Sequence, residues 1–162
     1  MSGPPLGSWT DQWNRVQLGF RRVEAIYRGR PEPEGTAGAL YDVFAFFVNC
    51  YHLGDWIEHD AGVPQRVSDE ARPYILTSDE LKICADLANR SKHSALVQPA
   101  KTGDKSTRPS SNDVTIMVGQ GKARHAFRVS SGEAEWDALD LALACVASWR
   151  TFLEQHSLGE VD

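Results

Sequence analysis

Asparagine, histidine and aspartate recur at helical spacing in two parts of this sequence, and such side chains can hold ligands or move protons. Within each part the residues follow one another at intervals of three or four. This spacing puts side chains on one side of a helix. We call the two sets together the polar seam; its members are Asn49, His52, Asp55, His59, Asp86, Asn89 and His93.

The polar seam has two interpretations. If the two helix faces meet, His52, Asp55 and Asn89 join Asp86 and His93 in one network, and histidine can act there as an acid or base near neutral pH. In the other interpretation the network is purely structural. Polar groups at the border of a core need partners, because an unpaired buried group costs about 1–3 kcal/mol.

Two other chemistries are metal binding by residues of the polar seam and nucleophilic catalysis by serine or cysteine. His52, Asp55, His59 and His93 have side chains that bind metals, but no HExxH and no repeated ExxH pair occurs, so we expect no metal and no cofactor. The serines and cysteines lack a nucleophile motif. The three cysteines, which form no CxxC pair, are expected to be buried free thiols; they are Cys50, Cys84 and Cys145.

Charge is distributed unevenly along the chain. The net charge is -5, yet residues 90–128 contain eight Lys or Arg and only two Asp. This stretch indicates an anionic partner, such as RNA, or else a basic loop exposed to solvent. No apolar run reaches the roughly 20 residues that cross a bilayer, and residues 1–7 do not resemble a secretory signal. We therefore expect a cytoplasmic protein that does not contact membranes.

The elements that must position the polar seam are amphipathic helices. Alternating apolar residues around the Gly119–Lys122 turn predict a β-hairpin. The last helix is expected to turn Trp136, Leu139, Leu143, Val146 and Leu153 inward. The predicted fold is all-α, a single domain of four helices with the hairpin inserted between the third and fourth. Its parts are a flexible terminus (1–7), helices (8–28, 36–60, 77–95, 133–155), a loop (61–76), an exposed basic loop (98–112) and the hairpin (113–130).

The segment Asp86–His93, DLANRSKH, resembles the signature of the HEPN superfamily. Its members are helical bundles that usually dimerise, and many are metal-independent ribonucleases of toxin–antitoxin, abortive-infection and CRISPR systems. His93 corresponds to the signature histidine and Asn89 to its polar position, whereas Ala88 stands where the signature has arginine. Some relatives that lack this arginine are inactive binding modules.

The resemblance and the polar seam together suggest a HEPN-like, RNA-acting or nucleotide-binding homodimer. In an endoribonuclease His93 would be the acid or base, Asn89 would orient it, and His52 with Asp55 would form the second wall. The phosphate-binding residues would be Arg90, Lys92, Arg124 and Arg128. Two alternatives stay open: a non-enzymatic, antitoxin-like or scaffold module that binds a protein partner through the basic loop and hairpin, and a metal-binding bundle.

Overall fold

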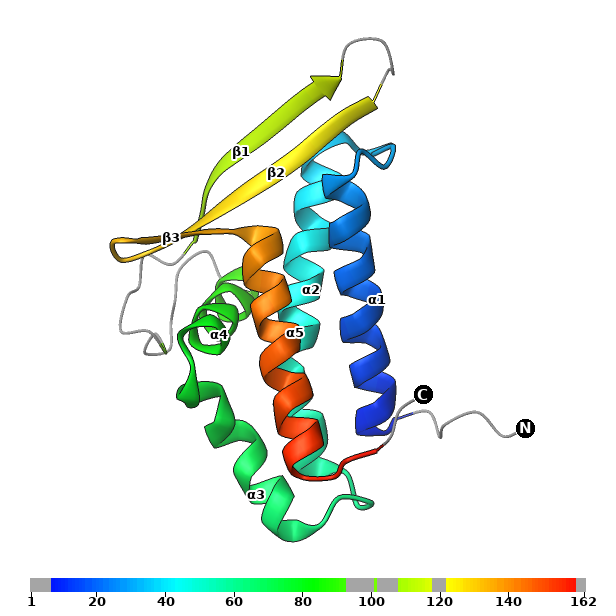
Figure 1. Cartoon of the computed structure of the whole chain (residues 1–162), viewed down its shortest axis with the longest axis vertical. Coiled ribbons are helices and arrows are strands. Elements are labelled where there is room, and N and C mark those ends of the chain that lie inside the picture. Colours follow the sequence, from blue (N-terminus) through cyan, green and yellow to red (C-terminus); the bar gives the residue numbers. More distant parts are fainter. Residues whose placement is uncertain (1–6, 93–100, 102–107, 118–121, 160–162) are drawn as a thin grey trace, which may run out of the picture.

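The computed structural model describes residues 7–92, 101, 108–117 and 122–159, with the backbone alone at 92, 108–117 and 122–124. The protein is mostly helical, with a small antiparallel sheet at one end (Figure 1). None of the described helices is long and apolar enough to span a membrane. The elements are α1 (Trp9–Tyr27), α2 (Gly35–His59), α3 (Gln65–Tyr74), the 3-10 helix η1 (Ile75–Thr77), α4 (Asp79–Lys92), β1 (Arg108–Met117), β2 (Lys122–Ser131), β3 (Ala134–Asp137) and α5 (Ala138–Gln155).

The mostly helical fold and the antiparallel pairing of β1 with β2 agree with the sequence-based prediction. The prediction of four helices was wrong, because the expected loop at 61–76 contains α3 and η1. Pro64 occupies the N-cap position of α3, where its fixed φ and missing N–H are tolerated. Pro73 lies in the last turn of α3, so a proline that indicated a loop instead stands next to the helix end.

The chain between β2 and α5 also differs from the prediction. Residues 134–137 form β3, which pairs with β2, so α5 begins at Ala138 and not directly after Gly132. The carboxylate of Asp137 accepts hydrogen bonds from the backbone N–H groups of Leu139 and Asp140, which makes it the N-cap of α5. Residues 108–112 belong to β1 and not to the predicted basic loop; residues 1–6, 98–100 and 102–107 lie outside the described residues.

The core lies among the helices, with α2 in contact with α1, α3, α4 and α5. Phe46, Phe47 and Trp149 are among its largest fully buried side chains. At Gly54 the backbone of α2 comes so close to α3 and α5 that an added Cβ would lie 3.3 Å from Ala71 O and from Trp149 Cη2. The missing side chain therefore sets how tightly the three helices approach one another.

Tyr27 at the end of α1 joins the sheet to the helices by hydrogen bonds. Its hydroxyl oxygen accepts a hydrogen bond from Phe127 N (3.0 Å), and its O–H donates to Asp137 Oδ2 (3.0 Å). Phe127 and Val129 of β2 are buried in the same core as the helices. These contacts hold β2, β3 and the start of α5 against α1, so a hairpin that would be marginal alone is packed on the bundle.

Candidate functional site

Three residues of the polar seam line one small surface pocket of about 170 Å³. His52 and Asp55 come from α2, one turn apart, and Asn89 comes from α4. The facing helices therefore bring together side chains that are 34 residues or more apart in the sequence. The other lining residues are Tyr51, Arg72 and Ile75.

Arg72 of α3 adds a cation to this pocket that sequence reasoning missed. Its Nη1 lies 3.8 Å from Asp55 Oδ1 and 3.3 Å from Glu58 Oε2. The Arg72 and Asp55 side chains are 54% and 50% exposed. Ion pairs with such exposure contribute only about 0–1 kcal/mol, so little free energy opposes a rearrangement in which Arg72 binds an anionic ligand.

The remaining residues of the polar seam have other surroundings. Asn49 accepts hydrogen bonds from Gln12 Nε2, through its backbone carbonyl (2.8 Å) and its side chain (3.3 Å). Asp86 is fully buried, and its carboxylate accepts a hydrogen bond from the backbone N–H of Lys101. Neither lines the pocket, and both fit the structural interpretation of the seam. His93, the proposed acid or base, lies outside the described residues.

The predicted phosphate-binding residues do not surround this pocket as far as the structure describes them. Arg90 follows Asn89 on α4 and is half-buried, and Arg128 is exposed on β2; neither lines the pocket. The side chains of Lys92 and Arg124 lie outside the described part of the chain.

The residues weighed for a metal site are only partly assembled. Ligand atoms of Asp55 and His59 lie within 4.8 Å of each other and of Glu58, on the surface of α2. His52 does not belong to this group. The cluster is exposed, and Arg72 is paired with both of its carboxylates.

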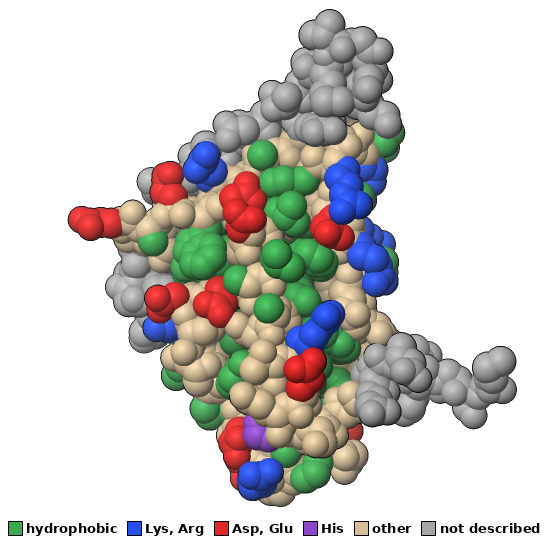
Figure 2. Space-filling model, in the orientation of Figure 1, with side chains coloured by type: hydrophobic (Ala, Val, Ile, Leu, Met, Phe, Trp, Pro, Cys, Tyr) green, Lys and Arg blue, Asp and Glu red, His purple; other side chains and the backbone are tan. Residues whose placement is uncertain are grey.

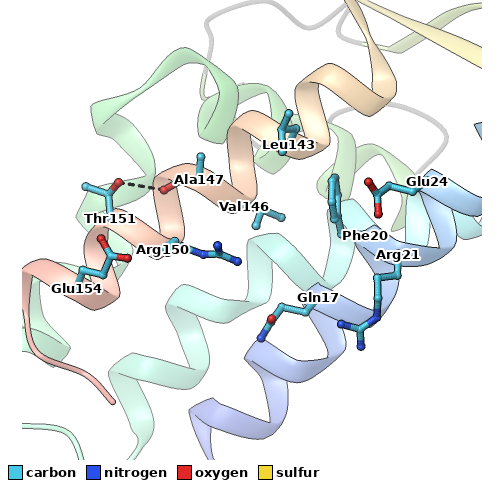
Figure 3. Close-up of a pocket in the computed structure, with 10 residues that line it drawn as sticks. All are labelled: Gln17, Phe20, Arg21, Glu24, Leu143, Val146, Ala147, Arg150, Thr151 and Glu154. Carbon is cyan, nitrogen blue, oxygen red and sulfur yellow. Dashed lines mark hydrogen bonds between the residues drawn. The ribbon is translucent and has the colours of Figure 1, made fainter. Parts of the chain in front are cut away.

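A larger groove of about 510 Å³ lies elsewhere, between α1 and α5. Phe20 and Val146 project toward each other between the two helices (Figure 3). Leu143 at the edge of the groove is 55% exposed, although helical periodicity predicted it to face inward. The face that carries α1 and α5 mixes hydrophobic, acidic and basic side chains (Figure 2). The charged residues of the groove are Arg21, Glu24, Arg150 and Glu154.

Comparison of the chain with protein-family models, with curated proteins and with solved structures finds no match.

Proposed function

We propose that this protein is a HEPN-like, RNA-acting or nucleotide-binding protein of a bacterial defence or toxin–antitoxin type, with the pocket of His52, Asp55 and Asn89 as part of its site. The observation that supports the proposal is the convergence of these residues from α2 and α4 on one solvent-reachable pocket. Arg72 supplies a cation at its edge, as an anionic ligand requires.

The proposed reaction is transfer of the RNA phosphate to the neighbouring 2′-hydroxyl. One histidine takes the proton of that hydroxyl, whose oxygen then attacks phosphorus, and a second acid protonates the leaving 5′-oxygen. The products are a 2′,3′-cyclic phosphate and a 5′-hydroxyl end. His52 and His93 are the two acid–base groups in this scheme, Asn89 orients one of them, and Arg72 stabilises phosphate charge.

The test is cleavage of a mixed RNA pool by the purified chain in EDTA. We expect cleavage to persist in EDTA and to fall about 100-fold or more in His52→Ala and His93→Ala, because general acid–base groups contribute about 10²–10⁴-fold. Cleavage should also fall in Asn89→Ala, because that side chain orients a catalytic histidine. His59→Ala is the matched control, since His59 is an exposed histidine of the same helix that does not line the pocket. A folded wild type without activity, or pocket variants as active as His59→Ala, would contradict the proposal.

The non-enzymatic module that binds a partner through the basic loop and hairpin remains the alternative function. Separately, the groove between α1 and α5 is a candidate interface for the expected homodimer. Its apolar lining includes Phe20 and Val146, with the exposed Leu143 at the edge, and both helices contribute one arginine and one glutamate to the lining. Such a surface is complementary to itself across a two-fold axis, because each arginine can meet a glutamate of the other copy. We therefore take a second copy of this chain as the occupant of the groove.

The oligomeric state tests this candidate. We expect a dimer by light scattering that Leu143→Glu converts to a monomer, because the substitution puts a charge at the apolar edge of the groove. Leu76→Glu is the control, since Leu76 is also 55% exposed but does not line the groove. A monomeric wild type, or a Leu143→Glu variant that remains dimeric, would rule out this use of the groove.

A further inference from the structure

The three cysteines meet in the core although they lie far apart in the sequence. Cys50 belongs to α2, Cys84 to α4 and Cys145 to α5, and their exposed fractions are 0%, 1% and 0%. Their Sγ atoms all lie within 4.8 Å of one another, and all three are free thiols. The expectation of buried free thiols is confirmed, and the structure adds that they form one cluster, which we call the thiol cluster.

A buried donor without a partner lies beside the thiol cluster. The indole of Trp149 is 0% exposed, and its Nε1–H makes no hydrogen bond of good geometry. The Trp149 side chain interacts with Cys50. When a bound ion displaces the proton of Cys50, the sulfur can accept a hydrogen bond from this indole N–H.

The thiols of Cys84 and Cys145 each donate to a backbone carbonyl. The Sγ of Cys84 donates to Phe47 O (3.3 Å), and the Sγ of Cys145 donates to Glu80 O (3.4 Å). Burial raises the pKa of both Cys84 and Cys145. An ion that binds all three sulfurs must therefore displace their protons, and it must form sulfur bonds strong enough to do so.

We infer that the thiol cluster binds a trivalent thiophilic ion, with arsenic(III) as the representative case. Three sulfurs at about 2.3 Å from a central ion would be about 4 Å apart, so spacings within 4.8 Å need little adjustment. No His, Asp, Glu or further Cys joins the cluster among the residues described, which disfavours four-coordinate zinc.

The net charge of the complex differs between the ions that three sulfurs could bind. Three thiolates with a trivalent ion give a neutral complex, whereas they leave a net negative charge with Zn²⁺ or Cu⁺. A buried net charge is costly at low dielectric, so the neutral complex is favoured in this core. The step is a ligand exchange without redox change: arsenous acid and three thiols give three As–S bonds and three water molecules.

The experiment is titration of the reduced, full-length chain with arsenite, followed by native mass spectrometry and X-ray absorption. Because the sulfurs are buried, the chain is loaded both as folded protein and by refolding with arsenite present. We expect one arsenic per chain, loss of three hydrogens and three As–S bonds. Cys50→Ala, Cys84→Ser and Cys145→Ser should each raise the half-saturating arsenite concentration at least tenfold; the serines preserve the bonds to Phe47 O and Glu80 O.

Val23→Ala is the control for loss of stability alone, since it shortens a fully buried side chain on α1 that carries no sulfur. It should bind arsenite like the wild type. Three results would each overturn the inference: no arsenic in the refolded wild type, coordination by two sulfurs only, or cysteine variants that titrate like Val23→Ala. Tighter binding of Zn²⁺ or Cu⁺ than of arsenite would overturn the choice of a trivalent ion.

Discussion

At the scale of single residues, two glycines inside helices have opposite roles. A Cβ at Gly54 would lie 3.3 Å from each of Ala71 O, Ile75 Cδ1 and Trp149 Cη2. A Cβ at Gly19 would lie at least 3.5 Å from its nearest neighbours, which is ordinary contact. Helix propensity favours alanine over glycine at both positions. The neighbouring atoms therefore decide whether a glycine-to-alanine substitution raises or lowers the stability.

We expect Gly54→Ala to lower the free energy of unfolding by about 1–2 kcal/mol, because overpacking costs about 1–3 kcal/mol and the propensity gain of up to about 1 kcal/mol offsets only part of it. Gly19→Ala is the matched substitution and should raise the free energy of unfolding by up to about 1 kcal/mol. Urea denaturation of both variants measures the difference. An equal gain in the two variants would show that α2 has room at Gly54.

At the scale of elements, Tyr27 connects α1 with the sheet and with the start of α5. Burial, together with the nearby negative charge of Asp137, raises the pKa of Tyr27 to about 12. The hydroxyl oxygen also accepts a hydrogen bond from the backbone N–H of Phe127, so loss of the hydroxyl leaves a buried donor without this partner.

We expect Tyr27→Phe to cost about 1–3 kcal/mol at neutral pH. In the wild type the folded state holds the Tyr27 proton more tightly than the unfolded state, whose tyrosine pKa is about 10. Its contribution is therefore complete below pH 10 and is lost as pH rises from 10 to 12. Over this pH range the free energy of unfolding should fall less steeply in Tyr27→Phe than in the wild type. Tyr41→Phe, at a tyrosine 71% exposed, should follow the wild type.

Long amphipathic elements were predictable from the sequence and short ones were not. The stripes of α1 and α2 extend over 19 and 25 residues and gave ends within one residue of those observed. Across α3 and the start of η1 the buried apolar residues are Val67, Ala71 and Ile75, and two prolines hide their periodicity. The four residues of β3 depend on pairing with β2, which local pattern does not encode.

The candidate site follows the same division. His52 and Asn89 could be named in advance because spacing on long helices determines which side chains share a face. Arg72 could not, because it belongs to the helix that was missed; the recurrence of Val67, Ala71 and Ile75 every four residues was the available signal. The groove at Leu143 was hidden because periodicity identifies an apolar face but does not reveal whether a neighbour covers it.

At the scale of the whole molecule, one core includes residues from every helix and from β2. We expect a single cooperative unfolding transition, with far-UV circular dichroism and tryptophan fluorescence giving the same urea midpoint. Val129→Ala, on β2, should lower both midpoints equally, because Val129 is 2% exposed and belongs to this core. A shift seen by one signal only would mean that the sheet unfolds separately from the helices.

The three buried sulfurs belong to three different helices, so their reactivity reports the rate at which the core opens. A thiol-specific dye can modify any of them only after the helices separate, so the rate of dye incorporation at excess reagent reports how often the interior opens. If this rate equals the global unfolding rate, the thiols react only after complete unfolding; a faster rate means that they react after local opening of the core. A cysteine placed at an exposed position would react far sooner, so the native cysteines need not be removed before the chain is labelled for spectroscopy.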